Sequence, residues 1–275
     1  MWAPLLSRAA ISKLAVITYF WHTGGMQTSP PARAAAPTRR ARQRAAAIDE
    51  IKALARCQLA EQGPGGISLR AIAREMGTAS SALYRYFPSQ GDLITALCIE
   101  AYDSLAAALT AARDAQSPGD HAGRWAALCH AYRRWSLEHP SDFALIFGTP
   151  LPGYQAPPQA TAAAAGRTLA VPAHVYAAAV QAGAADPGRA RIPAGLQTGP
   201  LWSALAGDSA PTGDPALAGI VLTAWASLLG YLVAEIFGSL TELIASTDLL
   251  YRAHVRTVMA GMGFEPAFLA SAEAR

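Results

Sequence analysis

Polar and basic side chains gather between residues 68 and 86 in a pattern suited to hydrogen bonding with nucleic acid. Arginine and serine side chains can bond base edges in a major groove, while tyrosine and threonine hydroxyls can bond phosphate oxygens. We expect base contacts from Arg70, Ser80, Ser81 and Arg85, and phosphate contacts from Ser68, Thr78, Tyr84 and Tyr86. The chemistry predicted for this segment is recognition of double-stranded DNA.

Two short helices joined by a tight turn must position these side chains. Ser68 can cap the first helix, whose apolar residues recur at helical spacing: Leu69, Ile72, Ala73 and Met76. Gly77 can adopt the left-handed conformation of a turn, residues 78–80 can cap the second helix, and Pro88 ends it. Ala82, Leu83 and Phe87 then point inward. This pattern predicts a helix-turn-helix, and the alternative interpretation is a helical hairpin within an ordinary bundle.

Residues 40–100 resemble the DNA-binding domain of the TetR family of bacterial regulators. The matching features are a long first helix ending near Gly63, the block 67–73, the Gly77 turn, the segment 81–87 and the Asp92-Leu93 pair. The resemblance implies a homodimer whose two recognition helices read a pseudo-palindromic operator and whose C-terminal domain holds a small ligand. It also implies repression, the usual mode of the family. The family often has a phosphate-binding lysine where this chain has Gln90.

Charge is distributed unevenly along the chain. Residues 33–90 contain ten Lys or Arg against four Asp or Glu, whereas residues 91–275 contain ten against fifteen. A basic N-terminal region attracts phosphates. Its densest cluster, Arg39, Arg40, Arg42 and Arg44, is either an arm that reaches the DNA or a solvated tail.

The whole chain is expected to be all-α, because no sustained two-residue alternation indicates a sheet. We divide it into a disordered or mis-assigned extension, 1–36, a three-helix helix-turn-helix domain, 37–89, and a larger helical ligand-binding and dimerisation domain, 90–275. Translation is expected to start at Met26 instead of Met1. Helices are predicted over 90–115, 121–138, 140–148, 159–182 with an interruption near Pro172, 215–237 and 247–261. A shorter helix or turn segment is predicted over 193–206, and loops are predicted at 149–158 and 207–215.

The last two helices are expected to form the homodimer interface. Segments around 138–148, Trp225 and Gly230 resemble the Trp-His-Gly (WHG) subfamily of TetR regulators, although Leu229 replaces the motif's histidine. The resemblance implies a four-helix interface through 215–237 and 247–261. Apolar residues recur on these helices at Ala218, Leu222, Trp225, Leu229, Leu232 and Ile236, then at Leu249, Leu250, Val255, Val258 and Met262.

Aromatic residues of the C-terminal region are candidates for the lining of an effector pocket. Cavities of this kind suit a small, largely apolar molecule. The candidates are Trp125, Tyr132, Trp135, Phe143, Phe147, Tyr176, Trp202, Trp225 and Tyr231. Aromatic residues of this kind are more often ordinary core residues than pocket residues.

Other classes of protein find little support in the sequence. An enzyme would need a nucleophile elbow, a phosphate-binding loop or paired acidic residues, and the chain has none; no cofactor and no metal are expected, because the six histidines lack ligand spacing. Cys57, Cys98 and Cys129 fit reduced core thiols of a cytoplasmic protein better than a redox sensor. The remaining alternative is a membrane-associated interaction protein organised around 220–238, but Glu235 and the glycines there favour a buried helix.

Overall fold

The computed structural model describes residues 38–148, 151, 153–193, 195–199, 202 and 214–265. These residues form helices and no strand, apart from an isolated bridge between Ala185 and Phe264, which confirms the all-α prediction. The predicted extension at 1–36 and half of the predicted segment 193–206 lie outside the described residues, and 195–199 contain a turn and no helix.

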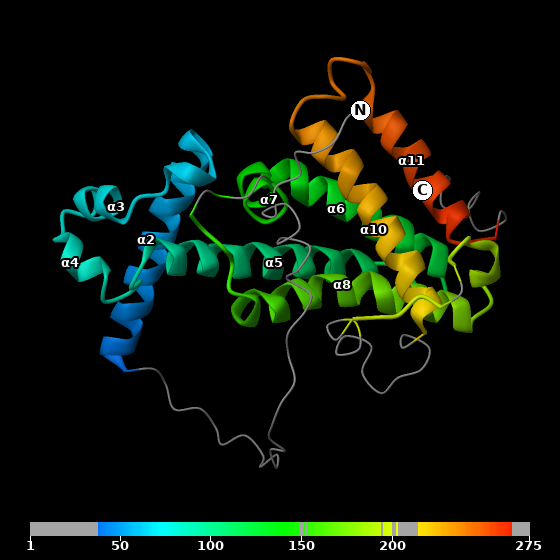
Figure 1. The fold of residues 1–275 in the computed structure, drawn as a ribbon, viewed down its shortest axis with the longest axis horizontal. Helices are drawn as coiled ribbons and strands as arrows, with labels where there is room; N and C mark the ends of the chain where they lie inside the picture. The colour runs from blue at the N-terminus through cyan, green and yellow to red at the C-terminus, as the bar shows by residue number, and fades with distance from the viewer. Residues whose placement is uncertain are drawn as a thin grey trace, which may run out of the picture.

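From residue 38, where the described chain begins, the N-terminal part contains α2 (Arg39–Gln62), α3 (Leu69–Glu75) and α4 (Ser80–Leu83), with the 3₁₀ turn η2 (Pro64–Gly66) after α2. Thr38 caps α2 and Ser68 caps α3, each accepting a hydrogen bond from the backbone N–H three residues later. Gly77 has φ of 64°, the left-handed conformation expected of the turn. Figure 1 shows α3 and α4 at one end of the molecule.

The second helix of this motif differs from its prediction in two respects. Its N-cap is Ala79, which has no side-chain acceptor, so no hydroxyl of residues 78–80 caps it. Its α-helical part ends at Leu83, and the chain continues to Phe87 through tighter turns, in which the N–H groups of Arg85 and Tyr86 donate three residues back. This tightening satisfies the carbonyls at the end of a short helix before Pro88.

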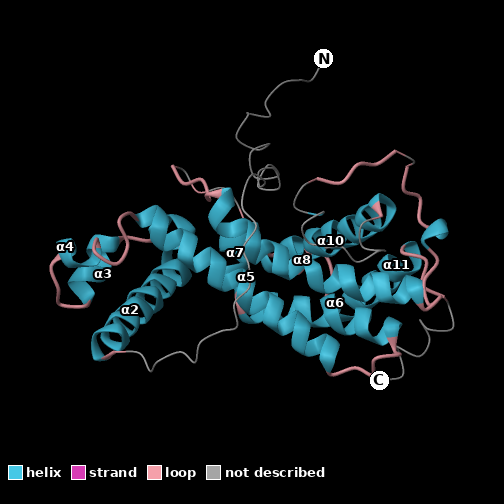
Figure 2. Ribbon diagram, turned by 90° about the horizontal axis from the view of Figure 1, so that it is seen from below, coloured by secondary structure: helices cyan, strands magenta, loops and turns pink. Residues whose placement is uncertain are grey.

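The C-terminal part contains α5 (Gln90–Asp114), α6 (His121–Glu138), α7 (Pro140–Phe147), α8 (Pro158–Gln181), η3 (Pro187–Arg189), α10 (Pro215–Ile236) and α11 (Thr247–Gly261). Figure 2 shows these helices gathered on one side of the molecule, with α2, α3 and α4 on the other. Helix α5 crosses between the two groups (Figure 1) and packs along α8 and α6.

Two hydrophobic cores follow from this arrangement. The smaller contains residues of α2, α3 and α4 together with Leu93, Leu97 and Cys98 of α5 and Leu145 of α7. The larger joins α5 from Leu105 onward with α6, α8, α10 and α11. Helices α5 and α7 therefore contribute to both cores.

The predicted interruption of 159–182 is wrong, because α8 runs through Pro172 without a break. A proline inside a helix removes one hydrogen bond and crowds the preceding turn. Here the neighbouring Val171, Ala173 and Val175 are buried in the larger core, and this packing on both sides of Pro172 holds the helix together.

Candidate nucleic-acid interface and aromatic cavity

The side chains predicted to contact DNA do not share one environment. Arg70, Ser81 and Arg85 are exposed, Tyr84 is 42% exposed, and Thr78 lies exposed just after the Gly77 turn. Ser80 and Tyr86 are half-buried. The structure thus leaves the α3–α4 surface open at one end of the molecule, where a duplex can approach.

Ser68 has a structural task in addition to its predicted one. Its side chain caps α3, and its backbone N–H donates to Oε1 of Gln58, which is buried on α2, at 2.8 Å. This bond fixes the start of α3 against α2. Ser68 remains half-exposed, so a phosphate contact stays a prediction.

The arginine cluster lies in the first turns of α2 and is helical, not an extended arm. The guanidinium of Arg44 lies 5.1 Å from the ring centroid of Tyr86, a cation–π contact between α2 and the end of the α4 segment. The contact places the positive charge of Arg44 beside the predicted DNA-binding surface. Arg44 and Tyr86 are far apart in the sequence, so the sequence alone did not predict this contact.

A cluster of ion pairs links the N-terminal helices to the C-terminal bundle. Glu100 of α5 pairs with Lys52 and Arg56 of α2, and Arg56 also lies 3.7 Å from Asp142 of α7. Burial raises the pKa of Glu100, but the hydrogen bonds from Lys52 and Arg56 outweigh it, so the pKa is lowered overall. For Asp142, burial prevails over Arg56 and the pKa is raised. A displacement of α7 would therefore change the ion pair between its Asp142 and Arg56 of α2.

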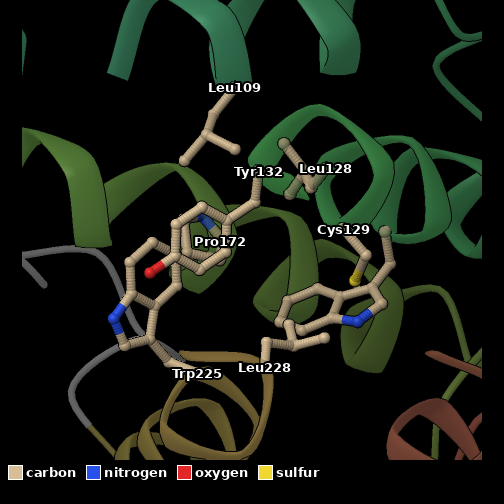
Figure 3. A pocket seen from close by; sticks show the side chains of 8 residues that line it. Leu109, Leu128, Cys129, Tyr132, Pro172, Trp225 and Leu228 are labelled. Atoms are coloured by element: carbon tan, nitrogen blue, oxygen red, sulfur yellow. The ribbon is translucent and has the colours of Figure 1, made fainter. Parts of the chain in front are cut away.

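An apolar cavity lies between α5, α6, α8 and α10. Its walls are Leu109, Trp125, Leu128, Cys129, Tyr132, Pro172, Trp225 and Leu228, and its volume is about 10 Å³. Figure 3 shows Tyr132 and Trp225 ring to ring at one side of it; their centroids are 4.4 Å apart and their planes differ by 11°. In this conformation the cavity holds about one water molecule.

Three of the nine predicted pocket residues line this cavity: Trp125, Tyr132 and Trp225. Phe147 of α7 contacts the rings of Tyr132 and Trp225 from outside the lining. The remaining five do not line it: Trp135, Phe143, Tyr176 and Trp202 are buried in the core, and Tyr231 is half-buried and packs against it.

Hydrogen bonds and stacking explain the position of several of these core residues. Trp135 donates to Oγ of Ser104, and Tyr176 donates to the Met262 carbonyl at 2.6 Å. Tyr231 donates to the carbonyl of Thr247. Their polar atoms are already used within the protomer.

Sequence reasoning missed the aliphatic and cysteine part of the lining. Leu128 and Cys129 lie on the face of α6 that also carries Trp125 and Tyr132, so helical spacing could have found them. Leu109 and Pro172 come from α5 and α8, and only the tertiary packing brings them here. Burial raises the pKa of Cys129 to about 12, so this thiol stays protonated.

Cys57 is exposed, contrary to the prediction that all three cysteines are core residues. It lies on the solvent side of α2, whereas Ala55 and Leu59 on the same helix are buried. Within the described residues no group of His, Cys, Asp and Glu side chains is placed to hold a metal ion.

The predicted dimer stripe divides between two environments. Ala218, Leu232, Val255, Val258 and Met262 are buried in the protomer's own core, although Val258 and Met262 also line the groove described below. Leu222 and Leu250 remain partly exposed, and Leu249 is 66% exposed.

A groove of about 320 Å³ lies on the outer surface of α10 and α11. It is lined by Thr223 and Ser227 of α10, by His254 and Thr257 of α11, and by the segment 190–192. Most of these side chains are small, so a helix could approach closely.

Helices α6, α10 and α11 are held together by an ion-pair clamp. Arg133 of α6 makes a bidentate bond to Glu235 of α10, at 2.8 and 2.7 Å, and a further bond to Asp248 of α11. It also lies over the ring of Tyr251. Burial raises the pKa of Glu235, but the hydrogen bonds from Arg133 and Thr247 and the charge of Arg133 together outweigh it, so this pKa is lowered.

Among the residues that the structure describes, two helices, α5 and α10, are long and apolar enough to cross a membrane by length and composition. Both contribute buried faces to the cores described above, and Glu235 on α10 is paired with Arg133. Core helices of soluble proteins pass the same test, so their hydropathy is weak evidence for a membrane span.

Comparisons with known proteins agree with the arrangement of this site. A family model described as bacterial regulatory proteins, tetR family, matches residues 51–97, and one described as tetracyclin repressor-like, C-terminal domain, matches residues 125–258. The second match does not confirm the WHG subfamily. The HTH-type transcriptional regulator Rv1816 of Mycobacterium tuberculosis is 33% identical over 215 residues, which cover 77% of this chain and 90% of the relative.

Solved structures show the same fold. The regulatory protein SCO4313 is 33% identical with a TM-score of 0.63, and the match covers 81% of this chain and 100% of that one. A protein of unknown function from Rhodococcus sp. RHA1 is 24% identical with a TM-score of 0.59, covering 78% and 95% of the two chains.

Proposed function

This chain belongs to the TetR family of bacterial regulatory proteins, and from that premise we propose that it is a homodimeric repressor released from its operator by a small, largely apolar effector. As a member of the family it is a DNA-binding transcriptional regulator and not an enzyme. The observation that carries the proposal is the open α3–α4 surface, with Arg70 and Arg85 exposed and Arg44 stacked beside it. We place the protein in the cytoplasm, where its operator lies.

The proposed operator contacts fall into two groups. Base contacts are assigned to Arg70, Ser81 and Arg85, which are exposed, as side chains that read bases must be. Ser80, which is half-buried in the same segment, keeps its predicted base contact. Phosphate contacts are assigned to Ser68, Thr78, Tyr84 and Tyr86. We assign residues 37–89 to the DNA-binding domain and 90–275 to the ligand-binding and dimerisation domain, although the smaller core extends into α5.

A second copy of the chain is the proposed occupant of the α10–α11 surface. The partly exposed Leu222, the groove beside Ser227 and Thr257, and the small residues of this surface suit helix-to-helix packing. Because α3 and α4 lie at the opposite end of the molecule (Figure 1), the pairing would leave both recognition segments free for the DNA.

Helix α7 is the proposed link between effector and operator. Its Phe147 contacts the rings of Tyr132 and Trp225, while its Asp142 lies beside Arg56 of α2. A ligand that shifts α7 would therefore alter the position of α2 and with it the separation of the two recognition segments. Since two half-sites must be met one helical turn apart, a small shift is enough.

The test is a fluorescence-anisotropy titration of the purified chain against DNA from its own upstream intergenic region, with random DNA at the same stated salt concentration as the control. We expect tight binding to one two-fold-symmetric site and at least a thousandfold weaker binding to random DNA. A matched pair of variants locates the interface: Arg70→Ala removes specific binding, whereas Arg167→Ala, at an exposed arginine on α8, leaves it unchanged. Equal affinity for both DNAs, or equal losses in both variants, would contradict the proposal.

A further inference from the structure

Two residues that line the apolar cavity carry buried hydrogen-bond donors that no protein atom satisfies. Neither donor atom is exposed to the cavity in this conformation, so the lining must move before a ligand can reach it. Among the described residues, Nε1 of Trp125 and the hydroxyl of Tyr132 are buried and have no hydrogen-bond partner. Trp125 is 2% exposed and Tyr132 is 1% exposed. Leaving such a group unpaired destabilises a folded protein, so buried donors without partners are rare in native structures.

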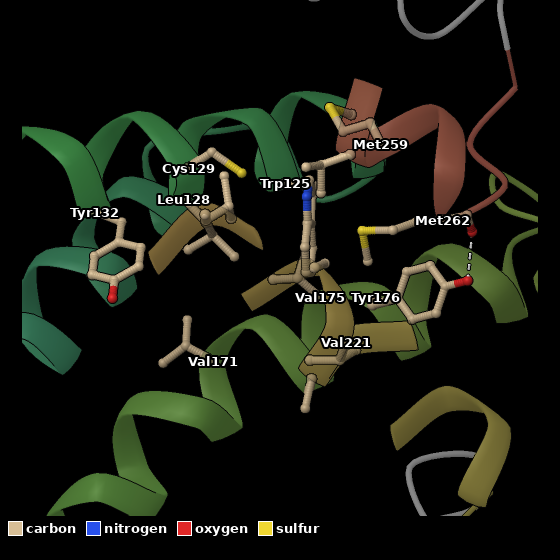
Figure 4. Close-up of a cluster of buried hydrophobic side chains, with 14 of the residues drawn as sticks. Trp125, Leu128, Cys129, Tyr132, Val171, Val175, Tyr176, Val221, Met259 and Met262 are labelled. Atoms are coloured by element: carbon tan, nitrogen blue, oxygen red, sulfur yellow. Dashed lines mark hydrogen bonds between the residues drawn. The ribbon is translucent and has the colours of Figure 1, made fainter. Parts of the chain in front are cut away.

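The two donors belong to one face of one helix. Trp125 and Tyr132 are seven residues apart on α6, two helical turns or roughly 10 Å along its axis. Figure 4 shows both side chains extending from α6, with Leu128 between them. Both line the cavity, whose other walls are apolar.

The lining also sets the charge of what it can hold. None of its eight side chains is charged. The nearby cation Arg133 is already committed to Glu235 and Asp248. An ionised ligand would lose its hydration without gaining a counter-charge, which is strongly unfavourable.

The stacked rings of Tyr132 and Trp225 determine the shape of the ligand that the cavity can admit. Trp225 is half-buried, whereas Tyr132 is fully enclosed, so Trp225 is the ring that can move away from the stack. A ligand that takes its place recovers the stacking on Tyr132 only if it is itself flat and aromatic. The present volume of about 10 Å³ requires such a displacement, since it holds no more than a water molecule.

We propose that this cavity is the effector site, that its ligand is a neutral, planar aromatic molecule with an acceptor oxygen at its edge, and that Trp225 moves aside to admit it. The acceptor is needed because an indole N–H can only donate. The hydroxyl of Tyr132 donates as well, since it stays protonated in this surrounding. The proposal rests on the proposed function, because it names the class of effector that would release the operator.

The experiment uses three probes of one skeleton: 9-fluorenone, fluorene, which lacks the acceptor, and 9-fluorenone-2-carboxylate, which adds a charge. Binding to the full-length chain is measured by calorimetry. We expect 9-fluorenone to bind about tenfold or more tighter than fluorene, the effect of one buried donor gaining a partner. The carboxylate should bind at least tenfold more weakly than 9-fluorenone.

Matched variants test the atoms involved. Trp125→Phe and Tyr132→Phe remove only the donors and should reduce the preference for 9-fluorenone over fluorene to threefold or less in at least one case. Trp135→Phe is the control on the same helix, since its N–H already donates to Ser104, and it should keep the preference. Trp225→Ala should strengthen binding of 9-fluorenone several-fold, because the displacement is no longer needed.

Equal binding of fluorene and 9-fluorenone, tighter binding of the carboxylate, no binding of any probe, or a preference insensitive to both donor variants would overturn the proposal. Weaker binding to Trp225→Ala would overturn the role given to that ring. The anisotropy titration on the same preparation separates this failure from failure of the proposed function. A chain that binds its operator but none of the probes refutes the effector class alone, whereas a chain that binds no specific DNA refutes the regulator.

Discussion

Two buried tyrosines of the larger core differ in whether the side-chain hydroxyl has a hydrogen-bond partner. The same Tyr→Phe substitution should therefore have different effects on stability at the two positions. The hydroxyl of Tyr251 donates to the Cys129 carbonyl at 2.6 Å, whereas that of Tyr132 has no partner. We expect Tyr251→Phe to lower the free energy of unfolding by about 1 kcal/mol, and Tyr132→Phe to leave it unchanged or raise it. Urea unfolding of both variants, followed by circular dichroism, measures this. A loss in Tyr132→Phe equal to that in Tyr251→Phe would mean that its hydroxyl is satisfied.

Exposed residues at the recognition surface predict a second contrast, in DNA binding. Arg85→Ala should cost roughly 1–3 kcal/mol on the preferred operator and much less on random DNA, because a base contact carries specificity. Tyr84→Phe should weaken both by a similar factor, since a phosphate contact is independent of sequence. Anisotropy titrations at one salt concentration compare the four affinities. If Arg85→Ala lost the same factor of affinity for the operator and for random DNA, the assigned base contact would be wrong.

Helices α6, α10 and α11 depend on the Arg133 clamp, which predicts a response to acid. The pKa of Glu235 in the folded chain is lowered from its ordinary value of 4.5, so its contribution to stability is present above pH 4.5 and is lost as the pH falls through the folded value. Glu235→Gln should therefore be less stable than the parent at pH 7, and its stability should fall less between pH 5 and pH 3.

Thermal unfolding across this pH range measures the difference, and Glu242→Gln, a substitution at an exposed glutamate beyond the end of α10, is the control. The control should follow the parent chain at every pH. Parallel pH curves for Glu235→Gln and the parent would show that the clamp adds no acid sensitivity.

At the level of elements, the sequence predicts what local chemistry decides. The cap at Ser68 and the turn at Gly77 were both predicted, because each follows from residues close together in the sequence. Continuity of α8 through Pro172 does not, because it depends on contacts with helices distant in the sequence. The same holds for the cavity: aromatic composition identified three of its walls, but its other members come from four helices that only the folded chain brings together.

At the scale of the whole molecule, the proposed dimer would cover the α10–α11 surface. A bulky charged substitution on this surface is therefore expected to separate the subunits without changing the fold of each one. Ala226 is exposed on α10, next in sequence to Ser227, which lines the groove. Ala226→Arg should convert the dimer to a monomer of unchanged helicity and weaken operator binding at least a hundredfold, because one half-site is then read alone.

Light scattering after gel filtration gives the mass of each species. Ala107→Arg, the same substitution at an exposed position of α5, should remain dimeric and bind the operator normally. If Ala226→Arg stayed dimeric, the subunits would have to meet through another surface.

Helix α5 shares its length between two cores, with Cys98 in one and Leu105 in the other. This arrangement has a practical consequence for building chimeric regulators from this protein. A junction placed at Pro88, at the end of the helix-turn-helix, would transfer the DNA-binding domain without Leu93 and Leu97. These two residues of α5 complete the core of that domain. A junction near Ala101, between the two sets of contacts, would carry each core intact and give hybrids that couple a new sensor to this operator.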